Sequence, residues 1–200
     1  MPTAPVLHLA LDSEADALLS RDPFALLVGM LLDQQIPMER AFAGPRTLAD
    51  RLGTPDRLDP LAVAAWDPDE FAALTARPPA VHRFPGSMAG RVQALARAVT
   101  DRYGGDAAEV WAGAASGPDL LARLRDLPGF GEQKARIFLA LLGKQLGVCP
   151  EGWREAAGAY GEDGSRRSVA DVVDGATLAE VRAYKQQVKK LAKQQAAAET

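Results

Sequence analysis

The chain of 200 residues contains a single cysteine, Cys149, and two histidines, His8 and His82. One cysteine excludes an intrachain disulfide, a four-cysteine iron–sulfur cluster and a cysteine-rich zinc site. The histidines lie far apart in the sequence, which disfavours a zinc site built from them. We therefore expect no metal ligands and no tightly bound cofactor.

Isoleucine is also scarce, with two residues against 38 alanines. Alanine, leucine and arginine favour helices, whereas strands favour β-branched residues. The composition therefore predicts an all-α fold and disfavours an all-β protein. Because 48% of the residues are hydrophobic and 24% are charged, we expect the chain to bury a core.

Long apolar segments are absent as well. No apolar run reaches the roughly 18–20 residues that a membrane-spanning helix needs. The N-terminus has no basic segment followed by an apolar stretch, as a signal peptide would have. We therefore expect no membrane partner and a cytoplasmic location.

Lysine is missing from the first two thirds of the chain, since all six lysines lie at or beyond Lys134. The net charge of −3 argues against a protein that coats nucleic acid by charge alone. The positive charge is nevertheless concentrated toward the C-terminus, where four lysines repeat at helical spacing. They either follow a DNA backbone or form a solvated face. These residues are Lys185, Lys189, Lys190 and Lys193.

Start and stop signals divide the chain into about ten helices with short connectors. Asp22-Pro23 opens a helix over residues 23–32 that is apolar all round and should be buried. Gly44-Pro45 is expected to separate two short helices, at residues 38–44 and 46–52. The last helix is expected to start near Leu178.

The most informative stretch is Leu127-Pro128-Gly129-Phe130-Gly131, which stands between two amphipathic helical segments. Its glycines allow a tight turn and expose backbone N–H groups. The next helix begins at once, so its positive N-terminal end points the same way. Together these features predict a phosphate-sized anion site, the alternative being a helix–helix turn whose glycines serve only the bend.

These residues resemble the helix-hairpin-helix of the HhH-GPD superfamily of DNA glycosylases, which includes endonuclease III and the adenine–mismatch and 3-methyladenine glycosylases. Asp33-Gln34-Gln35, after the apolar residues 26–32, resembles the Ser-Gln-Gln or Ser-Ala-Gln of these enzymes. The resemblance covers about residues 15–160. It implies a two-lobed helical bundle with a core over residues 23–160 and the hairpin at 118–146. Residues 1–22 and about 161–200 would form part of one lobe.

The resemblance also implies a mechanism. Such enzymes bend the duplex, flip a damaged base into a pocket between the lobes and cut the base–sugar bond. DNA-binding roles are implied for Gly129, Phe130, Gly131, Gln133 and Lys134. The carbonyls of the hairpin are also a potential site for a monovalent cation.

The sequence departs from the family pattern at both catalytic positions. Gln133 stands where bifunctional members carry a lysine, and Lys134 follows about 100° further around the helix. An amide cannot form a Schiff base, so we expect no strand cleavage. Glu151 stands where the family has a catalytic aspartate, and we take it as the candidate carboxylate, the alternative being an acid that only complements a helix N-terminus. Asp33 and Asp171 are the next candidates.

Other residues complete the predicted site. The resemblance places Gln35, with Gln34 as the second choice, where relatives insert a polar side chain into the gap that a flipped base leaves. His82 and Arg83, in a proline-rich loop, are candidates for contacts with a groove or a phosphate. Trp153 is the candidate for stacking on the base, because it lies close to Glu151. Each of these residues could instead serve the core or a helix end.

The sequence thus predicts a monofunctional DNA glycosylase of base excision repair that binds lesion-containing double-stranded DNA as a cytoplasmic, nucleoid-associated monomer. A non-catalytic DNA-damage-binding protein of the same fold is the main alternative. A protein-interaction module, in which the glycines form only a turn, is a third hypothesis. Duplex binding separates the third from the others, and base release separates the first two.

Overall fold

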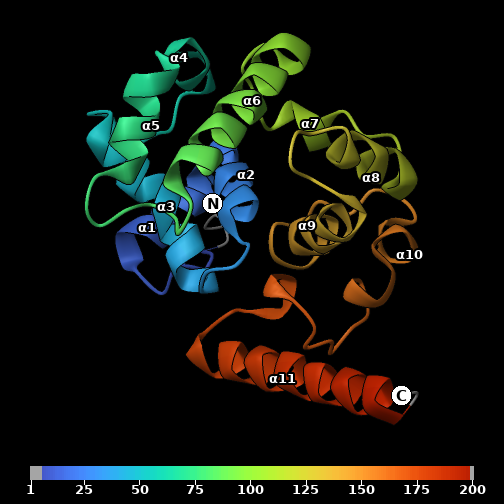
Figure 1. Ribbon diagram of the computed structural model, residues 1–200. Coiled ribbons are helices and arrows are strands. Elements are labelled where there is room, and N and C mark those ends of the chain that lie inside the picture. The colour runs from blue at the N-terminus through green and yellow to red at the C-terminus, as the bar shows by residue number, and fades with distance from the viewer. Residues whose placement is uncertain (1–5, 199–200) are drawn as a thin grey trace.

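The computed structural model describes residues 6–198, and every regular element in that range is helical (Figure 1). The predicted all-α fold is therefore confirmed. The elements in chain order are α1 (Ser13–Arg21), α2 (Pro23–Leu32), α3 (Met38–Arg51), α4 (Pro60–Ala65), α5 (Pro68–Ala76), α6 (Pro85–Tyr103), α7 (Glu109–Ala112), α8 (Gly117–Arg125), α9 (Glu132–Gln145), α10 (Trp153–Ala157), the short 3₁₀ helices η1 (Gly158–Tyr160) and η2 (Val169–Asp171), and α11 (Gly175–Ala198).

The helices form two neighbouring groups around a common hydrophobic core. Helices α1–α6 lie together on one side of Figure 1, and α7–α10 lie together on the other. In the first group α3 packs on α2, while α4 and α5 pack on α6; in the second, α8 and α10 pack on α9. Apolar side chains of both groups belong to one buried cluster. The two groups are therefore joined through their cores.

Helix α2 is buried along its length because nearly all of its residues are apolar. The Asp22 side chain caps its start by accepting a hydrogen bond from the Ala25 N–H at 3.0 Å, and Pro23 occupies the first turn. The helix ends at Leu32, directly before the polar residues 33–35. The prediction of a buried helix over residues 23–32 is confirmed. Because this helix is held in the core, the polar loop that follows it has a fixed starting point.

The predicted break at Gly44-Pro45 is wrong, because α3 continues through Pro45 to Arg51. A Cβ atom on Gly44 would lie 2.6 Å from Leu32 Cδ1 and 3.1 Å from Val81 Cγ1. The absent side chain therefore lets α3 pack closely on α2. This packing compensates for the backbone hydrogen bond that Pro45 cannot donate.

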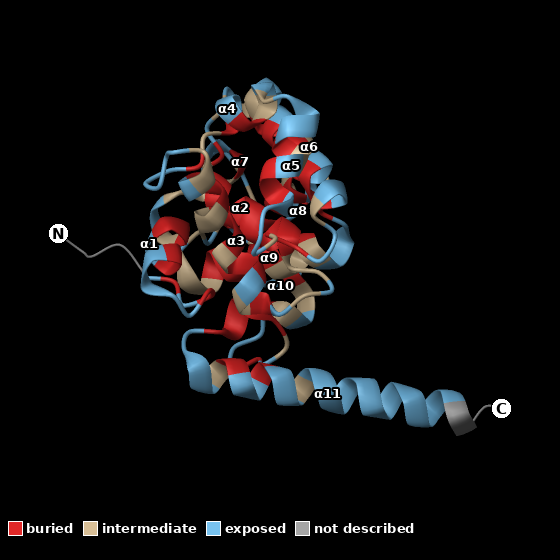
Figure 2. Cartoon of the chain, turned by 60° about the vertical axis from the view of Figure 1, so that its left-hand side comes forward, coloured by how far each residue is buried: buried red, intermediate tan, exposed pale blue. Residues whose placement is uncertain are grey.

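The C-terminal segment is attached to α9 by a buried ion pair. Lys144 Nζ lies 2.6 Å from Asp171 Oδ1, with only 14% and 2% of the two side chains exposed. Asp171 also accepts hydrogen bonds from the N–H groups of Arg167, at 2.9 Å, and Ser168, at 3.2 Å. These contacts hold η2 against α9. Helix α11 then extends past the body of the molecule, with most of its later residues exposed (Figure 2).

The predicted lobe of residues 1–22 and 161–200 stays a prediction. Helix α1 packs on α2 and α3, whereas α11 packs on η2 and reaches α3 through the ion pair of Arg182 with Glu39, at 2.7 Å. Residues 1–5 and 199–200 of the two predicted segments lie outside the described residues. Within residues 6–198, no helix combines the length and the apolar character needed to cross a bilayer.

The buried ion pair gives a first prediction. Asp171→Ala should lower the free energy of unfolding by roughly 3–5 kcal/mol, because it leaves the Lys144 ammonium buried without its partner. Asp163→Ala is the matched control, since Asp163 is 85% exposed beside Arg154 and should lose less than about 1 kcal/mol. Urea denaturation measures both values. Equal losses in the two variants would contradict a structural role for the Asp171 carboxylate.

Candidate functional site

The turn between α8 and α9 (residues 127–131, here called the glycine turn) packs directly against α2. Gly129 has a φ of +84°, a conformation that favours glycine. A Cβ atom on Gly129 would also overlap Leu31 Cδ1 of α2. The bend therefore favours glycine at position 129, and a side chain there would have to displace Leu31 Cδ1. The Phe130 side chain is buried edge-on against Phe138, so only its backbone is available to DNA.

Gly131 has a different role in the same turn. Its φ of −73° is ordinary, and no atom lies within 4 Å of the position of a Cβ atom. It precedes α9 without a side-chain cap, and the N–H groups of residues 131–134 have no hydrogen-bond partner among the described residues. Glu132 places an acid there, but Arg125 and Arg136 pair with it at 2.9 and 2.7 Å. The N-terminus of α9 is therefore open to an anion.

Lys134 connects α9 to the end of α2. Its Nζ atom donates hydrogen bonds to the carbonyl oxygens of Met30, at 2.7 Å, and Leu31, at 3.0 Å. These are among the last carbonyls of α2, which a helix leaves without backbone partners. Burial lowers the pKa of Lys134 to about 8, although the charge of Asp33 raises it. The predicted orientation of Lys134 away from the face of Gln133 fits this contact with α2.

Asp33 lies beside this lysine, directly after α2. Its carboxylate is half-buried and accepts no hydrogen bond from the described residues. Burial raises the pKa of Asp33, while Lys185 and Lys134 lower it and Glu39 raises it further. A partly buried carboxylate without a fixed partner, held among lysines, is typical of a functional site.

The loop after α2 presents Gln35 to solvent. Gln35 is exposed with a φ of +58°, a conformation that is uncommon for a residue with a side chain. The half-buried Gln34 side chain folds back onto the end of α2, where its Nε2 donates a hydrogen bond to the Leu31 carbonyl at 2.9 Å. Of the two glutamines, Gln35 is therefore the exposed one, and its role in filling the gap in a duplex stays a prediction.

His82 supports this loop and does not itself face outward. It is 1% exposed, and its Nδ1 accepts a hydrogen bond from the Phe84 N–H at 3.0 Å. The proton must then be on Nε2, which donates to the Gln34 carbonyl at 2.8 Å. The predicted DNA contact of His82 would thus be indirect. The neighbouring Arg83 is exposed and stacks on Phe84 at 5.2 Å, and Phe84 is 44% exposed.

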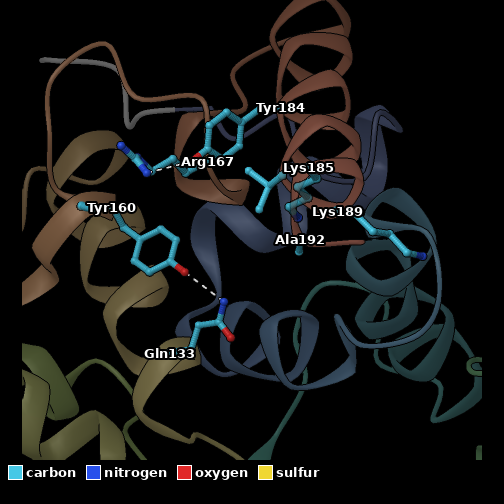
Figure 3. Close-up of a pocket in the computed structure, with 9 residues that line it drawn as sticks. Gln133, Tyr160, Arg167, Tyr184, Lys185, Lys189 and Ala192 are labelled. Atoms are coloured by element: carbon cyan, nitrogen blue, oxygen red, sulfur yellow. Dashed lines mark hydrogen bonds between the residues drawn. The ribbon is translucent and has the colours of Figure 1, made fainter. Parts of the chain in front are cut away.

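Gln133 opens into a cavity of about 480 Å³ between the second group of helices and α11. Its Nε2 donates a hydrogen bond to the Tyr160 hydroxyl at 2.9 Å, and both side chains face the cavity (Figure 3). This cavity could not be predicted from the sequence, because no motif connects the start of α9 with α11. The side chains that give the cavity its polar character are Gln133, Tyr160, Arg167, Tyr184, Lys185 and Lys189.

Glu151 and Trp153 lie at the other end of α9, away from this site. The Trp153 ring packs on Gly143, which is ten residues past Gln133 and so about 15 Å further along the helix axis. Trp153 is 8% exposed within the core, and the Glu151 carbonyl accepts a hydrogen bond from Gly117 at the start of α8. The structure does not bring Glu151 and Gln133 together, and the burial of Trp153 disfavours a base pocket there.

The other two candidates for the catalytic carboxylate, Asp171 and Asp33, differ in their surroundings. Asp171 is committed to its ion pair with Lys144 and to capping η2, so it is unavailable for chemistry on a ligand. Asp33 is the carboxylate that the structure places beside the glycine turn. In the sequence, only the polar Gln34 and Gln35 that follow Asp33 indicate a functional site. The fold is needed to bring Lys134 and Lys185 near its carboxylate.

No group of three or more histidine, cysteine, aspartate or glutamate side chains among residues 6–198 is arranged to hold a metal ion. A monovalent cation at the carbonyls of the glycine turn stays a prediction. No family model matches this chain, and neither a curated protein nor a solved structure matches it. The glycosylase resemblance therefore stays a prediction from the motif residues.

The effect of the Asp33 charge on Lys134 gives a second prediction. The pKa of Lys134, about 8 in the native chain, should fall further in Asp33→Asn, because the charge that raises it is removed. The ¹³C NMR signal of Lys134 Cε, assigned by its loss in Lys134→Ala, measures the titration. Asp50→Asn is the control, since Asp50 pairs with Arg46 in α3. A Lys134 pKa near the ordinary 10.4 or so would contradict the buried placement of the amine.

Proposed function

We propose that the protein is a monofunctional DNA glycosylase that removes a damaged or mismatched base. The observation that carries the proposal is the half-buried, unpartnered Asp33 carboxylate beside the glycine turn. The same region exposes Gln35 and the free N–H groups of the α9 N-terminus. A phosphate-binding turn, a side chain able to enter the duplex and a reactive carboxylate are what base excision requires.

Asp33 supplies the chemistry in this proposal, in place of the predicted Glu151. Its carboxylate stabilises the positive charge that develops on the sugar as the base leaves, or accepts a proton from the attacking water. The ammonium groups of Lys134 and Lys185 favour the ionised form of Asp33, whereas burial favours the protonated form. The net effect raises the pKa of Asp33, with burial as the largest cause.

Gln133 and Lys134, which follow Glu132, argue against cleavage of the DNA strand. The Gln133 amide cannot form a Schiff base. The Lys134 amine is held by the carbonyls of Met30 and Leu31, at 2.7 and 3.0 Å, and must leave them before it can attack a sugar. We therefore propose that the product is an intact abasic site.

A non-catalytic DNA-damage-binding protein is the second candidate. It is favoured by the position of Glu151, which lies away from the glycine turn, and by the engagement of Gln133 with Tyr160 at 2.9 Å. Such a protein would use the same turn and the same Gln35, and it would release no base from any duplex.

Base release tests the catalytic part of the proposal. The full chain is incubated with a panel of duplexes that each carry one alkylated, deaminated, oxidised or mismatched base. On the duplex that reacts, Asp33→Asn should lower the rate at least ~100-fold, since the amide keeps the size and loses the charge. Glu151→Gln is the control and should keep the native rate.

Borohydride should trap no covalent adduct in the same reaction. Trapping that disappears in Lys134→Ala would show that Lys134 does attack the sugar. Loss of activity in Glu151→Gln, with full activity in Asp33→Asn, would return the catalytic role to Glu151. No base release from any duplex would favour the damage-binding protein.

Duplex binding tests the glycine turn with a variant that should not unfold. Aspartate is a preferred residue before a helix, and Gly131 has an ordinary φ and open space around it. Gly131→Asp should therefore keep or raise stability, while its carboxylate occupies the N–H groups and repels phosphate. We expect the duplex affinity to fall on the order of 10-fold, which corresponds to a loss of about 1.4 kcal/mol of binding free energy.

The matched control for the turn is Gly90→Asp, which adds the same charge at an open, exposed position of α6. Fluorescence anisotropy with a labelled duplex measures the affinity, and thermal unfolding measures the stability. The same affinity in both variants would remove the glycine turn from the DNA interface.

A further inference from the structure

The cavity beside Gln133 is lined by basic side chains, of which Lys185 also interacts with the charge of Asp33. No acidic side chain lines it among the described residues. Arg167 is partly engaged, because it donates to the Tyr184 hydroxyl at 2.7 Å and lies 3.5 Å from the Glu162 carboxylate. Lys185 and Lys189, by contrast, form no hydrogen bond or ion pair with the described residues. Both lysines line the cavity from α11, and in Figure 3 the Lys189 side chain points outward, away from Gln133 and Tyr160.

These two lysines are held in a fixed position relative to α3 and η2. They stand four residues apart on α11, so they share one face with Cβ atoms about 5–6 Å apart. The start of α11 is anchored by the buried Leu178 and Val181 and by the ion pair of Arg182 with Glu39, at 2.7 Å. The lysines follow within two turns of that anchor. Their position is thus set by the fold, although α11 is exposed beyond it.

The lysines continue the anion site of the glycine turn. Gln133 lies in the first turn of α9, two residues after Gly131, and it also lines the cavity. An anionic chain that meets the free N–H groups at Gly131 therefore lies next to Lys185 and Lys189. The described part of α11 after Glu180 contains five basic residues and no acidic one, so its net charge attracts a polyanion.

We propose that the face of α11 with Lys185 and Lys189 is a second binding site for the DNA phosphate backbone. The glycine turn binds one phosphate through N–H groups, and the ammonium groups of Lys185 and Lys189 bind phosphates further along the same strand. The C-terminal helix then closes over the DNA from the side of α9. This inference rests on the DNA binding in the proposed function, but not on base release.

The salt dependence of duplex binding tests the second site. A lysine that neutralises one phosphate contributes about −0.9 to the slope of log affinity against log salt concentration. Over about 50 to 200 mM KCl, Lys189→Gln should make that slope shallower by about one, and Lys185→Gln with Lys189→Gln by about two. Glutamine keeps the helix propensity of lysine, so α11 should stay folded. The probe is a short duplex with one abasic-site analogue.

Lys190→Gln is the matched control, since Lys190 is equally exposed, stands one residue away and does not line the cavity. It should keep the native slope. Equal slopes for Lys189→Gln and Lys190→Gln would overturn the second site, and so would tighter binding to poly-glutamate than to the duplex. If Gly131→Asp weakens binding in that case, the proposed function stands without α11. If the native chain binds no duplex, both proposals fail together.

Discussion

The contact between Lys134 and the end of α2 is the constraint on which the candidate site depends. Its ammonium binds the carbonyls of Met30 and Leu31, which α2 cannot satisfy itself. The same end of α2 packs on Gly129, so one helix terminus fixes the glycine turn, the start of α9 and the loop that carries Asp33. Residues about 100 positions apart in the chain thereby form one surface.

Much of the fold could be predicted from local signals. The apolar residues 23–32, with Asp22 as cap, predict the buried helix that α2 forms, and the glycines at 129 and 131 predict the turn before α9. Helix breaks were less predictable, because Pro45 is accommodated inside α3 by the close packing of Gly44 on Leu32. That packing is a tertiary contact, which the local sequence does not encode.

The site could be predicted only in part, for a related reason. Gln35 and Gly131 are both exposed, whereas the resemblance implies Glu151 only by its position in the chain. The distance along the chain does not show that α10 runs back along α9 from its far end. The importance of Asp33 depends on burial and on Lys134 and Lys185, which the fold alone brings near it.

The most direct test of the account is an amide NMR titration of the full chain with a duplex that carries one abasic-site analogue. If the end of α2 and the glycine turn form one DNA-binding surface, the largest shifts should fall together on Asp33, Gln35, Gly131 and Gln133 and remain small at Glu151. Shifts at Glu151 and Trp153 with none at Gln35 or Gly131 would contradict that claim, and so would an unchanged spectrum.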